Sequence, residues 1–200
     1  MRRLDLLGVA GRVAKILGVE NCLLVGGLAV GAHGYVRATG DVDFVAKSGL
    51  TEVRRLMRNE GIQAILTRGD AFEGDVPCVQ GTIGGIRVDV MPPVVPIEWA
   101  RAIEVPVGRA GRLRIVDLEG LLRLKLRAGG PRDLMDVAAL IIRHPDQEQR
   151  AIEFARAYGV DGRLEVWRED PRLKAEAAVG RGFRGVRRRG KTPAPRKRHA

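Results

Sequence analysis

The chain of 200 residues has little cysteine and no long hydrophobic run, and each shortage excludes a class of protein. Its two cysteines, Cys22 and Cys78, lie in apolar segments where a buried free thiol is usual, and without a nearby pair of histidines they do not make a zinc site. This scarcity favours a reducing cytoplasm over a secreted, disulfide-bonded protein. No segment predicts a membrane span, and Arg2 and Arg3 are followed by Asp5 rather than by the apolar core of a signal peptide.

Acidic residues are missing from the C-terminal end, and this accounts for most of the net charge of +11. Residues 180–200 contain nine Lys or Arg and no Asp or Glu, so the rest of the chain carries only about +2. With Phe183 as its one aromatic residue, this segment cannot bury enough apolar surface to fold alone. We predict a disordered basic tail over 179–200 that attracts nucleic acid electrostatically. The alternative is that the tail only aids solubility.

Hydrophobic periodicity predicts a mixed α/β fold, and the 45% of apolar residues are enough for a core. Helices are expected at 4–17, 28–35, 118–128, 132–143 and 147–158, with another ending at 59 and a helical turn at 97–102. Strands are expected at 22–25, 41–46, 64–67, 79–83, 86–91, 103–107 and 113–116, with a loop at 70–77. Thr51 and Asp117 are expected to cap helices, and Gly84-Gly85 to join two strands as a hairpin.

Three aspartates on the predicted strands form the strongest candidate site. Asp41 and Asp43 stand two apart, so their side chains share one face of a strand, and Asp89 lies mid-strand between Val88 and Val90. Carboxylates so close repel one another unless a cation lies between them, and hard oxygen ligands suit Mg²⁺ or Mn²⁺. The alternative is that these carboxylates are simply solvated at a strand edge or end.

Gly26 and Gly27 separate an apolar strand from an apolar helix. Such glycines let a backbone approach a phosphate at a helix N-terminus, although an ordinary strand-to-helix turn uses glycine too. A phosphate contact beside a carboxylate metal site is typical of enzymes that transfer phosphoryl or nucleotidyl groups. No arrangement of Ser, His and Asp, or of Cys and His, predicts a competing nucleophile.

Taken together, these motifs resemble the polymerase-β-like nucleotidyltransferase superfamily, which combines a Gly-Gly or Gly-Ser turn, a D-x-D strand and a later carboxylate. The closer resemblance is to the bacterial branch that includes AbiEii-type toxins. That branch shows G-G-x-A, H-G and R-x-T-x-D-x-D, and later K-L-x-A-G and K/R-D-x-x-D. The matching segments here are 26–29, 33–34, 37–43, 125–129 and 132–136, so the resemblance covers about 20–143.

The resemblance implies a polymerase-β-like fold with a mixed sheet and C-terminal helices, in which 1–116 form the catalytic domain and 117–178 a helical part. It implies a metal-dependent enzyme that transfers NMP from an NTP to an acceptor hydroxyl. Asp41 and Asp43 would hold Mg²⁺ or Mn²⁺ on the triphosphate, and Asp89 would share a second ion at the acceptor. The implied nucleotide contacts are Gly26, Gly27, Arg37, Thr39 and Lys125.

Several alternatives stay open at this stage. Lys125 either reaches a nucleotide phosphate or pairs with Asp133 or Asp136, which are also candidates for a general base or for a residue that supports one, and both roles can hold together. Arg37 either contacts phosphate or pairs with a surface acid. His33 is expected to be a packed histidine rather than a base.

The acceptor is open among RNA, a protein hydroxyl and a small alcohol, and a cognate partner protein in a toxin–antitoxin or defence pair is a further expectation. The alternative function is a non-catalytic relative that keeps the fold and binds nucleic acid or a partner protein.

Overall fold

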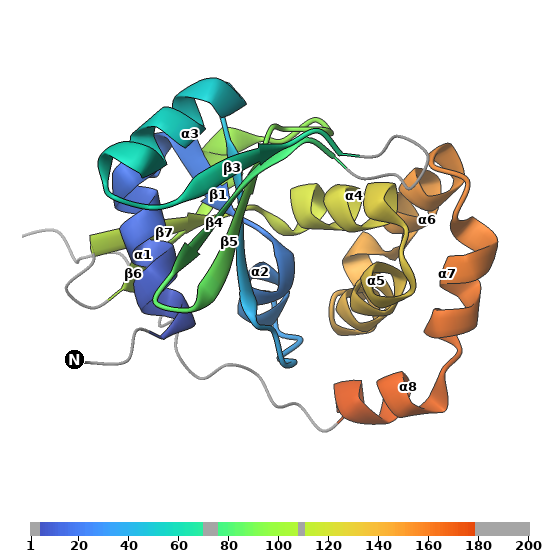
Figure 1. The fold of residues 1–200 in the computed structure, drawn as a ribbon. Coiled ribbons are helices and arrows are strands. Elements are labelled where there is room, and N and C mark those ends of the chain that lie inside the picture. Colours follow the sequence, from blue (N-terminus) through green and yellow to red (C-terminus); the bar gives the residue numbers. More distant parts are fainter. Residues whose placement is uncertain (1–4, 70–75, 108–110, 179–200) are drawn as a thin grey trace, which may run out of the picture.

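The computed structural model describes residues 5–69, 76–107 and 111–178 (Figure 1). The fold is mixed α/β, as predicted, with a seven-stranded sheet in the order β3-β4-β5-β2-β1-β7-β6. Most of the expected loop at 70–77, and all of the expected basic tail at 179–200, lie outside the described residues. None of the helices in the described part is long and apolar enough to cross a membrane.

The strands and helices occur in the order that the sequence predicts, with two further helices at the end. The strands are β1 (Cys22–Leu24), β2 (Asp41–Ala46), β3 (Ala64–Thr67), β4 (Cys78–Ile83), β5 (Ile86–Met91), β6 (Ile103–Val107) and β7 (Gly111–Ile115). The helices are α1 (Leu6–Leu17), α2 (Gly26–Ala32), α3 (Leu50–Asn59), α4 (Leu118–Ala128), α5 (Pro131–Arg143), α6 (Glu148–Ala157), α7 (Asp161–Arg168) and α8 (Pro171–Ala178). The expected turn at 97–102 is a 3₁₀ helix at Trp99–Arg101.

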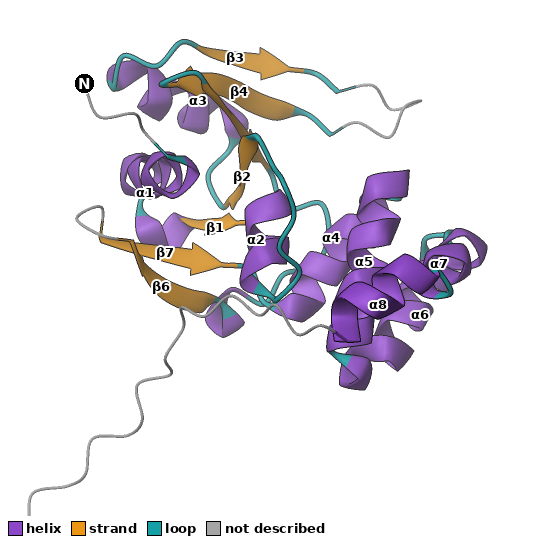
Figure 2. Cartoon of the chain, turned by 90° about the horizontal axis from the view of Figure 1, so that it is seen from below, coloured by secondary structure: helices purple, strands orange, loops and turns teal. Residues whose placement is uncertain are grey.

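The two faces of the sheet differ in what covers them. Val42 pairs in register with Val88, and Val88 with Gly81, whose missing Cβ would lie 2.7 Å from Met57 Cε of α3. This face is therefore packed under α3, with α1 beside it, and Val42 and Val88 are fully buried. Because side chains alternate along a strand, Asp41 and Asp43 project from the opposite face. Helix α2 contacts β2 and α4 (Figure 2).

The helices after β7 form a cluster around α5, which contacts α4, α6, α7 and α8. Residues 137–141 of α5 are buried in this cluster. Asp117 caps α4 as predicted, because its side chain accepts a hydrogen bond of 3.1 Å from the Gly120 N–H. The helical cluster lies beside the sheet on the side of α2 (Figures 1 and 2).

The predicted limits of two helices are wrong. Thr51 is not a cap, because α3 begins at Leu50 and the extended residue before it is Gly49. Helix α2 begins at Gly26 rather than after the glycines and ends at Ala32, since the first glycine adopts φ +63° and lets the strand turn at once into the helix. The helix expected at 147–158 is confirmed as α6, which a 3₁₀ turn at Pro145–Gln147 precedes.

Candidate functional site

The structure brings the three predicted carboxylates together on one face of the sheet. Strands β2 and β5 are parallel neighbours, and their register sets Asp43 directly opposite Asp89 and Asp41 opposite Arg87. Asp89 is only 8% exposed, and Asp43 is partly buried. We call Asp41, Asp43 and Asp89 the carboxylate site.

Burial and mutual repulsion make the site unfavourable for negative charge. The pKa of Asp43 rises from 3.8 to about 6, chiefly because the carboxyl is buried and further because Asp41 and Asp89 lie nearby, while Lys125 and Arg87 act in the opposite direction. A carboxylate with a raised pKa gains from a nearby cation, which stabilises its charged form. The site therefore favours cation binding.

Two of the three carboxylates already have partners from the protein. The Thr39 hydroxyl donates a hydrogen bond of 2.6 Å to Asp41 Oδ1. Arg87 pairs with both oxygens of Asp89, with its Nη2 2.7 Å from Oδ2 and its Nε 3.1 Å from Oδ1. In the described part of the chain, no group of three or more His, Cys, Asp or Glu side chains converges in a ready-made metal geometry. The donor set is nevertheless all oxygen, which is the chemistry that Mg²⁺ and Mn²⁺ prefer.

Gly26 is required where the backbone passes the carboxylate site. A Cβ at this position would lie 1.8 Å from Asp43 Oδ2, and the φ of +63° disfavours any other residue. At Gly27 a Cβ would lie 2.7 Å from Thr39 Oγ1. The glycine pair therefore lets the start of α2 pack directly against Asp43 and Thr39.

We expect Gly26→Ala to lower the free energy of unfolding by about 2–4 kcal/mol, from the positive φ and from the steric overlap with Asp43. Gly61→Ala is the matched control, because Gly61 also has a positive φ (+72°) but no atom lies within 4 Å of its Cβ position. Urea unfolding measures both variants. Equal losses would mean that the contact with Asp43 contributes nothing.

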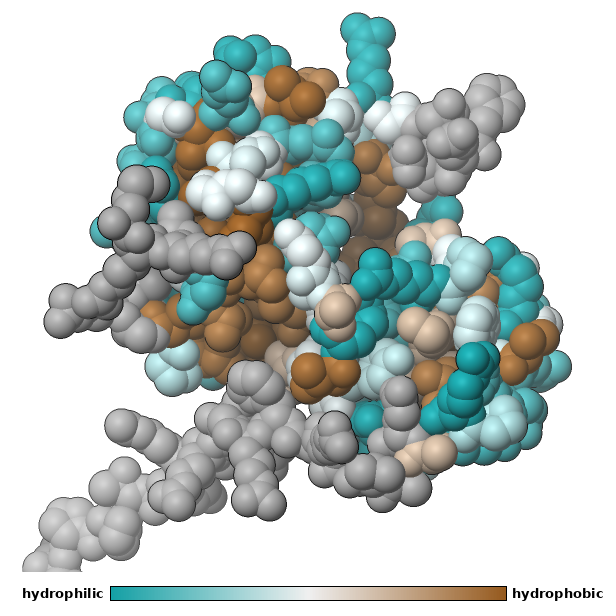
Figure 3. All heavy atoms as spheres, turned by 60° about the horizontal axis from the view of Figure 1, so that its bottom comes forward, coloured by the Kyte–Doolittle hydropathy of each residue, from teal (hydrophilic) through white to brown (hydrophobic). Residues whose placement is uncertain are grey.

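A cleft of about 600 Å³ opens beside the carboxylate site, between the sheet and the helices α4 and α5 (Figure 3). Apolar side chains such as Met91 and Leu124 form part of its wall. Its charged and amide side chains are Asp43, Gln80, Arg87, Asp89, Lys125, Arg127 and Asp133. A pocket of this size accommodates a small molecule such as a nucleotide.

The predicted nucleotide contacts do not all reach this cleft. Gly26 and Lys125 line it, whereas Gly27, Arg37 and Thr39 are not among the described residues that do. The sequence prediction missed Gln80 and Arg87. Arg87 stands two residues before Asp89, so strand alternation alone would have placed it on the same face.

Lys125 belongs to a buried ion network that also contains Arg37. Its Nζ lies 2.7 Å from Asp133 Oδ1 and 3.0 Å from Asp136 Oδ2. Arg37 donates to both oxygens of Asp136, at 2.5 Å from Nε and 2.6 Å from Nη2, and the Asp136 side chain is fully buried. The expected pairing of Lys125 with Asp133 or Asp136 is confirmed and extends to both, whereas the contact of Lys125 with phosphate stays a prediction.

The ammonium of Lys125 stays charged in spite of its position. Burial lowers its pKa, but the charges of Asp133 and Asp136 and their hydrogen bonds outweigh burial, so the pKa lies above the usual value of 10.5. A permanent positive charge therefore faces the cleft from α4.

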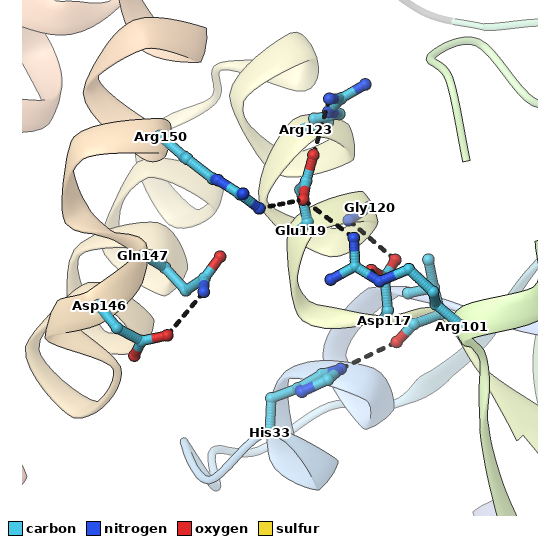
Figure 4. A network of polar contacts seen from close by, with 10 residues as sticks. His33, Arg101, Asp117, Glu119, Gly120, Arg123, Asp146, Gln147 and Arg150 are labelled. Atoms are coloured by element: carbon cyan, nitrogen blue, oxygen red, sulfur yellow. Dashed lines mark hydrogen bonds and ion pairs between the residues drawn. The ribbon is translucent and has the colours of Figure 1, made fainter. Parts of the chain in front are cut away.

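His33 is a packed histidine, as predicted. Its Nε2 is 2.9 Å from the Val116 carbonyl oxygen, and burial lowers its pKa (Figure 4). The same view shows a network that the sequence analysis missed, in which Glu119 accepts from Arg101, Arg123 and Arg150 at 3.2, 2.8 and 2.8 Å. This network joins α4 to α6 and to the 3₁₀ helix before β6.

No protein-family model and no curated protein matches this chain. Among solved structures, TM1012 from Thermotoga maritima, assigned as a nucleotidyltransferase, aligns with 64% of this chain and 88% of its own at 19% identity and a TM-score of 0.49. An antigenic nucleotidyltransferase-like protein from Paracoccidioides brasiliensis aligns with 88% and 93%, at 15% identity and a TM-score of 0.48. ANT(2″)-Ia in complex with adenylyl-2″-tobramycin aligns with 86% and 97%, at 16% identity and a TM-score of 0.43. Likenesses this distant say nothing about the activity of this chain.

Proposed function

We propose that the protein is a metal-dependent nucleotidyltransferase that transfers NMP from an NTP to an acceptor hydroxyl. The observation that carries this proposal is the placement of Asp43 opposite Asp89 on parallel strands, at the edge of a cleft whose far wall presents Lys125. Asp43 and Asp89 on the sheet, with the Lys125–Asp133 pair across the cleft, suit a ligand that brings both a metal ion and phosphates. In this proposal 1–116 carry the chemistry, and 117–178 supply Lys125.

The residues present fit a divalent cation. Asp41, Asp43 and Asp89 offer only oxygen ligands, and the raised pKa of Asp43 reflects its burial first and then a repulsion from the other two carboxylates, both of which a cation would offset. When bound, such an ion would neutralise phosphate charge and lower the pKa of the acceptor hydroxyl.

In this proposal, different residues of the site bind the phosphates and the acceptor. Lys125 attracts the phosphates from α4, with Gly26 and Gly27 as the proposed backbone contacts, and Asp89 faces the acceptor. The acceptor oxygen bonds to the α-phosphorus, the bond from that phosphorus to the bridging oxygen breaks, and pyrophosphate leaves. The hydroxyl proton passes to a carboxylate of the site or to water. Such chemistry depends on positioning and on charge rather than on a protein nucleophile.

The test is incubation of the protein with each labelled NTP, Mn²⁺ and either total RNA or a cell lysate, followed by location of the label. Asp41→Asn should lower transfer by more than about 100-fold, because it removes a charge needed in the transition state. Asp146→Asn, an exposed carboxylate on the helical part, is the control and should not change it. Unchanged Mn²⁺–NTP affinity in Asp41→Asn, measured by calorimetry, would contradict the proposal.

One observation favours a second candidate, a non-catalytic protein of the same fold that binds nucleic acid or a partner, as in a toxin–antitoxin pair of the AbiEii type. Arg87 already supplies a positive charge to Asp89, so this carboxylate has a partner without a metal ion. Thermal melting with Mn²⁺, with and without NTP, separates the candidates. Stabilisation that needs both ligands supports the enzyme, and indifference to both supports the binding protein.

A further inference from the structure

The exposed face of the sheet continues beyond the carboxylate site. The strand registers place Asp43 opposite Asp89, Asp89 opposite Gln80, and Gln80 opposite Ile65. Residues in such a cross-strand row share one face, so β4 and β3 extend the surface on which the carboxylates lie. A molecule lying along this row would reach Asp89 from the side of β4.

A second hollow, of about 480 Å³, lies over this part of the sheet. We call it the β3–β4 hollow. Its lining residues are Gly61, Gln63, Ile65, Gln80, Gly81, Thr82 and Arg87. Gln80 and Arg87 also line the cleft, so the two cavities adjoin at these side chains. The volume is that of a site for a small molecule.

The chemistry of the β3–β4 hollow is hydrogen bonding with one positive charge. The amides of Gln63 and Gln80 and the hydroxyl of Thr82 both donate and accept, which suits the hydroxyl groups of a ligand. Among the described lining residues, Arg87 alone is charged. The N–H groups of its planar guanidinium are spaced to donate two hydrogen bonds to a carboxylate or phosphate. A polynucleotide would need several cations and aromatic faces, and the described lining offers neither.

Arg87 is able to bind such a ligand although it forms an ion pair with Asp89 in this structure. The Arg87 side chain is 60% exposed, so its guanidinium can turn towards a ligand in solvent once another charge balances the buried Asp89. A cation on Asp89 would replace the guanidinium as the counter-charge and leave it free to bind an anion. Arg87 therefore links the carboxylate site to the β3–β4 hollow.

We propose that the β3–β4 hollow is the acceptor subsite, and that its occupant is a small, hydroxyl-rich molecule with one anionic group held by Arg87. The proposal rests on the proposed function and names the class of its acceptor. A hydroxyl at one end of such a molecule lies beside Asp89 while the anionic group lies against Arg87. Cationic polyols are excluded, because Arg87 repels them and no acid lines the hollow in the part described.

The test follows the side-chain amide NMR signals of Gln63 and Gln80 in isotope-labelled protein with Mg²⁺ present. Glycerol phosphate should shift both signals saturably, whereas glycerol and tobramycin should bind at least about tenfold more weakly, since they lack the charge-assisted contact. Arg87→Met should weaken the binding of glycerol phosphate by at least about tenfold, because it too removes the charge-assisted contact. Arg112→Met is the matched control, because Arg112 is also an ion-paired strand arginine and is 61% exposed.

A second variant keeps the test independent of Arg87. Gln63→Glu should weaken the binding of glycerol phosphate and strengthen the binding of tobramycin, because it places a negative charge in the hollow. Equal binding of all three probes, or equal effects of Arg87→Met and Arg112→Met, would overturn the proposal. Binding of each of the four NTPs with Mn²⁺ to the unaltered protein is measured alongside. Absence of binding of all four would remove the proposed function, whereas NTP binding without a probe response would remove only the acceptor subsite.

Discussion

Replacing Asp136 with Ala is expected to lower the free energy of unfolding by about 3–5 kcal/mol, because it breaks a buried ion network by removing its central anion. Asp136 is fully buried, and its two oxygens receive Arg37 from the segment before β2 and Lys125 from α4. Without it the Arg37 guanidinium, whose side chain is only 12% exposed, loses its carboxylate. The variant should therefore also loosen the contact between that segment and the helical part.

Urea unfolding measures this loss, and Asp133→Ala is the control. Asp133 is 26% exposed and pairs with Lys125 in the same network, so its removal should cost only about 1 kcal/mol. A cycle with Lys125→Met then gives the coupling energy between Lys125 and Asp136. Equal losses in the two aspartate variants would show that burial of Asp136 does not decide the effect. NTP affinity of Lys125→Met is a separate readout for the proposed phosphate contact.

The parts of the site that sequence could predict depend on local geometry. Asp41 and Asp43 share a face because strand side chains alternate, and Lys125 meets Asp133 because a short turn joins α4 to α5. Asp117 caps α4 through a contact three residues away. Each of these relations spans few residues, so the sequence pattern determines it.

The parts that sequence could not predict depend on long-range pairing. The register that sets Asp43 opposite Asp89 joins strands 46 residues apart in numbering, and no local pattern specifies it. Arg37 and Asp136 are separated by 99 positions. The β3–β4 hollow likewise exists only because β3, β4 and β5 align their exposed faces. The roles that we assign to these residues stay predictions.

Asp43→Asn is expected to stabilise the metal-free protein while it abolishes Mn²⁺–NTP binding. The pKa of Asp43 rises from 3.8 to about 6 on folding, so the folded protein binds more protons than the unfolded chain between these values. The free energy of unfolding of the parent therefore falls as the pH rises through this window, and the penalty is complete above it. Asparagine carries no charge and escapes the penalty.

The measurement is urea unfolding of parent and variant in EDTA from pH 4 to pH 7.5. The stability difference in favour of Asp43→Asn should grow from near zero at the acid end to at most about 3 kcal/mol at neutral pH, which is the free energy that corresponds to the pKa change. Asp146→Asn is the control and should show no such rise. A difference that is constant with pH, or that shrinks towards neutrality, would contradict the electrostatic origin of the effect. If Asp43→Asn is more stable than the parent but keeps its affinity for Mn²⁺–NTP, the charge of Asp43 destabilises the metal-free protein as predicted. The Asp43 carboxylate would then not be a metal ligand.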